Sequence, residues 1–105
     1  MSMAPYDLTP AAEADLQEIA RYTLRQWGAR QQRRYARLLA ACFQGIADGS
    51  ARARGFSERY PQAQVMRCEH HYVFFLYPAG QKPLIFAVLH ERMDLLARIG
   101  ERLTT

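Results

Sequence analysis

The sequence PLIFAVLHERMDLL, residues 83–96, decides how this chain is expected to fold. Its first part, Leu84 to His90, is apolar at every position before the final histidine. An apolar run of this length is typical of a strand that is covered on both faces. The residues that follow, His90 to Asp94, are mostly ionisable. We therefore predict a buried strand that leads directly into a polar segment, where binding or catalysis can take place at the edge of the core.

The length and composition indicate one folded domain spanning residues 1–105. Half of the residues are hydrophobic and 23% are charged, which is ordinary for a globular domain and unlike a disordered chain. No apolar run approaches the roughly 20 residues of a membrane-spanning helix. The N-terminus lacks the basic and apolar segments of a secretion signal, so we predict a cytoplasmic protein without a membrane span. Met3 offers a second start codon beside Met1.

The cysteines and histidines do not follow a metal-binding pattern. Cys42 and Cys68 are too few to predict a disulfide framework, and we expect both to be reduced in a cytoplasmic protein. No CxxC or HxxxH spacing accompanies them, and we predict neither a metal nor a cofactor. Cys42 falls within an apolar helical stripe, which predicts a buried and unreactive thiol.

Two helices are predicted in the first half of the chain. Thr9-Pro10 is a typical helix start, and the apolar positions that follow have helical spacing up to Gly28. A second helix is expected from about Ala29 to Asp48, where Gly49 ends it. Because so few residues separate the helices, they must fold back on each other as an antiparallel hairpin.

Strands are predicted around and after this hairpin. A short edge strand is expected at residues 4–8, and three longer strands at 65–70, 72–77 and 84–90. Residues 50–64 show no periodicity and are predicted to be a loop. Residues 94–103 are typical of a short terminal helix with Asp94 as its N-cap. The resulting β-α-α-β-β-β-α order indicates an α+β fold, with the helical hairpin on one face of a mostly antiparallel sheet.

The second face of this sheet poses a question. The strands YVFFLY and LIFAVL are apolar on both faces, whereas the hairpin supplies only one helical layer. Either the short terminal helix or a partner protein is expected to cover the other face, because a small domain seldom leaves such a surface exposed.

The charge indicates an anionic partner. The formal net charge is +4, and Lys82 is the only lysine among 14 cationic side chains. Arginine pairs bidentately with phosphate and carboxylate, so this bias fits a nucleic acid or an acidic protein segment. Composition does not separate these two.

Three stretches together carry a family resemblance: YDLTPAAEADLQEIARYTLRQWGARQQRRY at the start, HHYVFFLY in the strand pair and FAVLHERMD at the end. The chain resembles the ParE/RelE toxin superfamily, the toxin halves of type II toxin–antitoxin, or plasmid-stabilisation, modules. The resemblance extends from Tyr6 to Asp94. It implies the β-α-α-β-β-β fold that the periodicity also predicts.

The superfamily contains two mechanisms. RelE-like members resemble ribosome-dependent messenger RNA endonucleases, which need a base, an acid and a cation around the scissile phosphate. Arg67, His90 and Arg92 are the residues that would fill these roles here. The ionisable residues around them complete the set of nuclease candidates: Glu69, His70, His71 and Glu91.

ParE-like members instead are implied to poison DNA gyrase by binding it, without a catalytic site. The VLHERMD ending is typical of this branch, Lys82 lies in a predicted hairpin loop, and Ala87 stands where many members carry arginine. We therefore favour a gyrase-binding toxin that is not an enzyme. The residues predicted to bind the target are His90, Glu91, Arg92, Met93 and Asp94. A non-toxic scaffold that only binds an antitoxin is the remaining alternative.

The resemblance also implies a ParD-like antitoxin that forms a hetero-oligomer with the toxin. Its binding site is predicted on the helical hairpin, at Leu16, Tyr22, Trp27, Arg30, Arg34, Tyr35 and Arg37. The arginines of the second helix, Arg33 included, have three interpretations: a solvated face, a nucleic-acid contact, or a docking site for an acidic antitoxin segment. Direct binding of nucleic acid therefore stays open.

Overall fold

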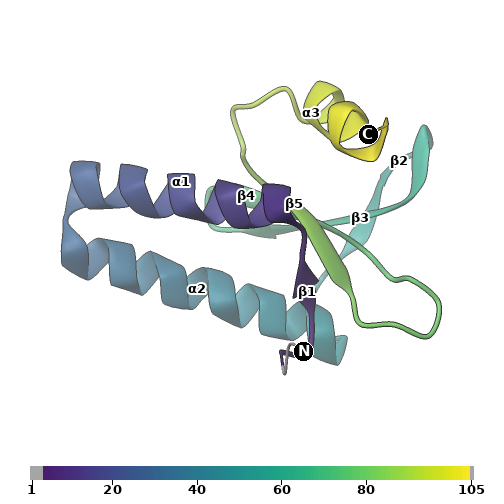
Figure 1. Cartoon of the computed structure of the whole chain (residues 1–105), viewed down its shortest axis with the longest axis horizontal. Coiled ribbons are helices and arrows are strands. Elements are labelled where there is room, and N and C mark those ends of the chain that lie inside the picture. Colours follow the sequence, from purple (N-terminus) through teal and green to yellow (C-terminus); the bar gives the residue numbers. More distant parts are fainter. Residues whose placement is uncertain (1–3, 105) are drawn as a thin grey trace.

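A computed structural model describes residues 4–104. Met1 and Met3, the two possible starts, lie outside the described residues. A helical hairpin lies in front of a five-stranded sheet, and a short C-terminal helix packs beside the strand that precedes it (Figure 1). The elements in chain order are β1 (Asp7–Leu8), α1 (Pro10–Trp27), α2 (Ala29–Asp48), β2 (Arg54–Ser57), β3 (Tyr60–Cys68), β4 (His71–Leu76), β5 (Leu84–His90) and α3 (Leu95–Thr104).

The helices begin and end at the residues that the sequence indicates. The Thr9 hydroxyl accepts a hydrogen bond from the Ala12 amide at 3.1 Å, which caps α1. Gly28, with φ of +89°, separates the two helices of the hairpin, and Gly49 ends α2 in the left-handed region. The Asp94 carboxylate accepts from the Ala97 amide at 3.2 Å and caps α3.

The sheet order is β1-β5-β4-β3-β2, so the apolar run Leu84–His90 forms an interior strand. β5 pairs antiparallel with β4 along its whole length and parallel with the two residues of β1. The predicted α+β fold with a mostly antiparallel sheet is confirmed. The N-terminal strand is shorter than expected, because only Asp7 and Leu8 pair with β5.

Both faces of the sheet are covered within the chain. The hairpin buries Leu39, Phe43 and Ile46 against one face, where they meet Val73, Phe75 and Val88 among others. The opposite face packs against α3, whose fully buried anchor is Ile99; its core comprises Ala63, Val65, Phe74, Phe86, Ala87 and Leu89. The terminal helix is therefore the cover for the second apolar face.

The prediction of a loop at residues 50–64 was wrong for most of the segment from Arg54 onward. Residues Arg54–Ser57 form β2, which pairs antiparallel with β3 and places Arg54 opposite Val65. β3 also begins at Tyr60, earlier than predicted. The local sequence is rich in arginine and glycine and shows no alternation, so pairing with β3, rather than intrinsic propensity, makes this segment a strand.

The prediction of two reduced cysteines was also wrong. Cys42 of α2 and Cys68 of β3 form a disulfide, with their Cα atoms 6.4 Å apart. Cys42 lies on the stripe of α2 that faces the sheet, and Cys68 lies on the sheet face that α2 covers. The place where a helix crosses a strand is a tertiary property, so neither residue's local pattern revealed this pairing.

An ion pair connects α1, β5 and α3. The Arg102 guanidinium binds Asp15 bidentately, at 2.8 and 2.9 Å, and also donates to the Phe86 carbonyl at 2.9 Å. The Asp15 carboxylate accepts from the Val88 amide at 2.9 Å. Since β1 covers β5 only as far as Ile85, these two side chains satisfy backbone groups on the edge of β5 beyond β1. They thereby hold α3 in place.

Among the described residues, none of the helices is both long and apolar enough to cross a lipid bilayer.

Candidate functional site

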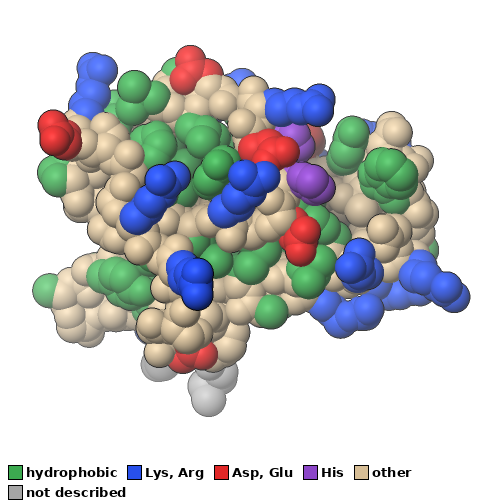
Figure 2. Space-filling view, turned by 180° about the vertical axis from the view of Figure 1, so that it is seen from behind, with side chains coloured by type: hydrophobic (Ala, Val, Ile, Leu, Met, Phe, Trp, Pro, Cys, Tyr) green, Lys and Arg blue, Asp and Glu red, His purple; other side chains and the backbone are tan. Residues whose placement is uncertain are grey.

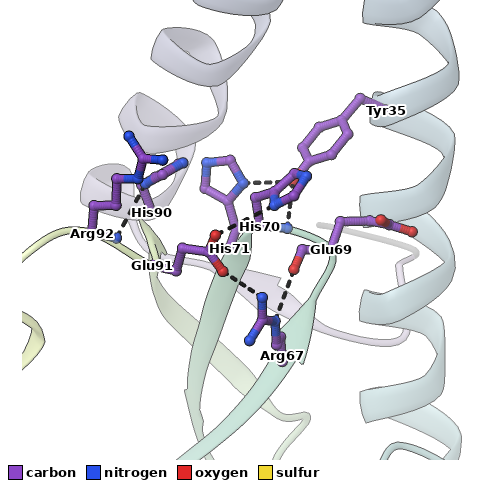
Figure 3. A network of polar contacts seen from close by, with 8 residues as sticks. All are labelled: Tyr35, Arg67, Glu69, His70, His71, His90, Glu91 and Arg92. Carbon is purple, nitrogen blue, oxygen red and sulfur yellow. Dashed lines mark hydrogen bonds and ion pairs between the residues drawn. The ribbon is translucent and has the colours of Figure 1, made fainter.

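The polar end of β5 lies beside the polar turn between β3 and β4. The strand register places Cys68, His71 and His90 in one row across three neighbouring strands. The rings of His71 and His90 lie 5.3 Å apart, and Tyr35 reaches toward this row from α2 (Figure 3). Residues that are far apart in the sequence therefore form one polar cluster at the end of the sheet.

Tyr35 is hydrogen-bonded to His71. Its hydroxyl lies 2.6 Å from His71 Nδ1 and 3.3 Å from the His70 amide, which can only donate. The hydroxyl proton is therefore available to Nδ1 when the imidazole is neutral. Burial, followed by the neighbouring His90 and His70, lowers the pKa of His71 from 6.5 to about 4, against the opposing pull of Glu91 and Asp15. Burial likewise raises the pKa of Tyr35, so its hydroxyl remains protonated.

This arrangement predicts a loss of stability in mild acid. Because the folded-state pKa of His71 is about 4 and its ordinary value is 6.5, the unfolded chain binds more protons between these values. The stabilising contribution is complete above pH 6.5 and is lost as the pH falls toward 4. We expect about 2 kcal/mol from this group, after allowing for its partial exposure. Urea unfolding at a series of pH values measures it.

The matched variants for this test are His71→Asn and His70→Asn. Asparagine at position 71 keeps an acceptor for Tyr35 but does not titrate, so the pH slope should become shallower between 6.5 and 4. His70 is the smaller of the two histidine charges that lower the pKa of His71, so its replacement should change the slope much less than His71→Asn does. Equal slopes in all three proteins would show that His71 does not control acid stability.

At the edge of this cluster, the Glu91 carboxylate is held by Arg67 and His70. Arg67 of β3 forms an ion pair with the Glu91 carboxylate, and His70 Nδ1 lies 3.4 Å from it. Arg67 Nε also donates to the Glu69 carbonyl at 3.0 Å. Although partial burial raises the pKa of Glu91, the Arg67 charge and the His70 contact hold it below its usual value. Glu91 therefore stays ionised and fixed in place.

The segment after β5 is exposed but ordered by backbone contacts. The Met93 amide donates to the His90 carbonyl at 3.0 Å, and the Arg92 amide lies 3.2 Å from His90 Nδ1. The side chains of Arg92, Met93 and Asp94 are exposed, with 45% of the Met93 surface accessible. Of the predicted target-binding set, these three face solvent, while His90 and Glu91 are partly buried beneath them.

The predicted nuclease residues gather at one end of the sheet (Figure 3), but Arg67 and His90 project from different faces of it. Arg67 is opposite Tyr72 in the register, whereas His90 is in the row of His71 and Cys68. Since successive strand residues alternate in direction, Arg67 and His90 leave the sheet on opposite faces. The guanidinium carbon of Arg67 lies over the Tyr72 ring, 5.8 Å from its centroid, whereas the His90 ring packs against the ring of His71. The nuclease roles predicted for Arg67 and His90 therefore fall on side chains that leave the sheet on opposite faces.

The helical hairpin carries an apolar groove of about 240 Å³ between α1, α2 and β1. Leu16 and Tyr35, both predicted for antitoxin binding, line this groove. Tyr22 and Trp27 do not line it; they are 56% and 69% exposed near the end of α1. The other predicted residues, Arg30, Arg34 and Arg37, are exposed on α2. The predicted set therefore divides into a groove, a cluster at the hairpin tip and a cationic helix face.

Comparison with known proteins identifies the family to which the chain belongs. The sequence profile of the family described as "ParE toxin of type II toxin-antitoxin system, parDE" matches residues 6–95. The chain belongs to the ParE toxin family. The predicted resemblance, and the choice of its ParE branch, are confirmed.

Two relatives of the ParE toxin family illustrate the match. The chain is 50% identical over 101 residues to "Toxin ParE" of Escherichia coli, covering 96% of this chain and 98% of that protein. It is 36% identical over 100 residues to "Toxin ParE1" of Caulobacter vibrioides, covering 93% of this chain and all of the relative. The match extends over nearly the whole chain, so this ParE-family toxin shares its entire domain with these proteins.

A solved structure supports the fold independently. The structure titled "Chromosomal ParDE TA system from P. aeruginosa" aligns with a TM-score of 0.68, covering 81% of this chain and 92% of that one. The two are only 15% identical, so the similarity concerns the fold of this ParE toxin and not its individual contacts.

Several residues that shape this ParE toxin were missed from the sequence. Asp15 was counted only as an acid in the first turns of a helix, and Arg102 was not singled out. Arg52, Arg54 and Tyr72 lie together with Arg67 around a pocket because β2 exists, which the sequence did not predict. Within residues 4–104, no three His, Cys, Asp or Glu side chains are grouped so as to hold a metal ion.

Proposed function

We propose that this ParE-family toxin binds DNA gyrase through the exposed segment after β5 and poisons it, and that a ParD-like antitoxin neutralises it. The observation that carries the proposal is the segment Glu91–Asp94. Arg92, Met93 and Asp94 are exposed, yet the backbone of the segment and Glu91 are held by contacts to β3, to the turn between β3 and β4, and to β5. A surface that is ordered before binding loses less conformational freedom on association.

The chemistry of this segment suits a protein target. Arg92 and Met93 are exposed next to each other, and Leu96, 44% exposed, lies in the first turn of the adjoining helix α3. Arginine and methionine are enriched in protein interfaces, where the former forms bidentate contacts and the latter fills irregular gaps. The separation of Arg67 from His90 by the sheet gives further support to a binding surface over a ribonuclease site.

The apolar groove of the hairpin is the proposed site for the antitoxin. It is lined by small and apolar side chains and bordered by exposed arginines on α2. An amphipathic helix with an acidic outer face matches this combination, because its apolar side fills the groove while its carboxylates meet the arginines. Tyr35 lines the groove and also contacts His71 beside His90, so an antitoxin bound in the groove can extend toward the target-binding segment after β5.

The deciding experiment induces the chain without an antitoxin and follows plasmid supercoiling, DNA breaks and transcript integrity in the same cells. We expect growth arrest, loss of negative supercoiling and DNA breaks, with intact messenger RNA. Purified chain should also inhibit supercoiling by purified gyrase. Transcript cuts within codons, with intact DNA, would overturn the gyrase proposal in favour of a RelE-like endonuclease. Normal growth would favour the non-toxic scaffold.

A further inference from the structure

A basic pocket lies on the same face of the sheet as α3, beyond the area that α3 covers. It encloses about 180 Å³ and is lined by side chains from the start of β4, the second half of β3 and the start of β2 with the residues before it, namely Arg52, Arg54, Val65, Met66, Arg67 and Tyr72. Figure 2 views the molecule from the side opposite to Figure 1 and shows Lys and Arg side chains around hydrophobic ones, beside carboxylates and histidines. Neither the antitoxin groove nor the exposed segment after β5 includes Arg52, Arg54 or Tyr72.

The strand register explains why the arginines converge. Arg54 is opposite Val65 on β3, so both side chains point to the face of the α3 core. Arg67 is two residues further along β3 and therefore points the same way. Arg52 precedes β2 by two residues and lines the same pocket. Three guanidinium groups thus lie around one half-buried ring.

Two of these charges form no ion pair within residues 4–104. Among the described residues, no carboxylate forms an ion pair with Arg52 or Arg54. Arg67, by contrast, is already paired with Glu91. The pocket therefore contains one internal carboxylate contact and two exposed guanidinium groups whose binding capacity is unused. Like charges gathered this closely are stabilised when an anion binds between them.

The contacts favour a protein carboxylate over a nucleic-acid phosphate. Glu91 shows that a carboxylate fits against Arg67 in this fold. The Tyr72 ring is partly buried and lies under the Arg67 guanidinium, so it offers little free surface for a stacked base. Binding of single-stranded nucleic acid relies on such stacking as well as on charge. The Glu91 carboxylate beside Arg67 would also repel a continuous phosphate chain.

We infer that this pocket binds an acidic, extended segment of a protein partner, whose carboxylates pair with Arg52 and Arg54. Glu91 acts as an internal competitor, because it holds Arg67 in the absence of the partner. The site lies across the sheet from the hairpin groove, so it is a second contact region of this chain. The inference does not depend on gyrase being the target of the toxin.

The experiment measures binding of a fluorescein-labelled hexaglutamate peptide to the purified full chain by fluorescence anisotropy at low salt. The variant is Arg52→Gln with Arg54→Gln. We expect it to weaken binding about tenfold, since each lost surface charge contact is worth a several-fold change. The matched control is Arg21→Gln with Arg25→Gln, which removes the same charge from exposed positions on α1 and should change affinity less than about twofold.

A second variant tests the competitor. Glu91→Gln should tighten peptide binding about threefold, because Arg67 is then released to the ligand. A hexathymidylate oligonucleotide of similar charge tests whether the pocket binds nucleic acid. We expect it to bind more weakly than the peptide. Undetectable peptide binding, equal weakening by both arginine pairs, or tighter binding of the oligonucleotide would each overturn the inference. Peptide binding and toxicity are measured in separate assays, so the failure of one proposal can be told from the failure of the other.

Discussion

Replacing Asp15 by alanine is expected to lower the free energy of unfolding by about 3 kcal/mol, a large share of the stability of so small a domain. The carboxylate accepts from Val88 and pairs bidentately with Arg102, and its side chain is only 15% exposed. Its removal leaves the Arg102 charge and the Val88 amide without their partner. Urea unfolding measures the change through the midpoint and the slope.

The same helix offers a matched control. Glu18 pairs with Arg21 at 2.9 Å, but the two side chains are 77% and 57% exposed. Such a surface pair contributes at most about 0.5 kcal/mol, so Glu18→Ala should be nearly neutral. The Asp15→Ala protein should also lose hydrogen-exchange protection at Val88, because this amide then lacks its acceptor. Equal costs for the two variants would contradict the structural role assigned to Asp15.

Replacing Arg92 and Met93 together by alanine is expected to abolish toxicity without loss of stability. Both side chains are exposed, so their removal creates no cavity. If they anchor the interface with the target, each contributes about 2 kcal/mol, which corresponds to roughly 30-fold in affinity. Colony counts after induction and inhibition of purified gyrase measure the effect. Urea unfolding of the variant should match that of the parent chain.

The control for this variant is Leu24→Ala with Arg25→Ala. It removes the same kinds of side chain from exposed positions near the far end of α1, where Leu24 is 51% exposed. Because these residues lie away from the proposed target-binding segment, toxicity should persist. Full toxicity of the Arg92 and Met93 variant would reject the segment after β5 as the target-binding surface.

The fold was largely predictable because its signals are local. Thr9 and Asp94 cap helices through contacts within one turn, and Gly28 separates the two helices of the hairpin by its backbone conformation alone. The continuous apolar run of β5 requires two covered faces wherever it lies. Residues 54–57 were missed for the opposite reason. They have no local strand preference, and only pairing with β3 makes them extended.

The candidate site was predictable in part. Arg92, Met93 and Asp94 were identified because a polar segment follows the most buried strand, and the structure places all three at the surface. Their proposed role in target binding remains a prediction. The grouping of Arg67 with His90 followed from residue type alone, and the strand register puts them on opposite faces. Register is set by partner strands, so neither residue's neighbours in sequence could reveal it.

The stretch from Pro83 to Leu96 illustrates the division between what local sequence determines and what tertiary structure determines. By itself, the sequence determined a buried strand, the polar segment after it and a capped terminal helix, because apolar periodicity and helix caps act over a few residues. Only the tertiary structure decided what covers that strand and what surrounds its end. The Asp15–Arg102 pair, the Cys42–Cys68 disulfide and the arginine pocket each join elements that are distant in the chain. Such contacts depend on packing angles and register, which no local pattern specifies.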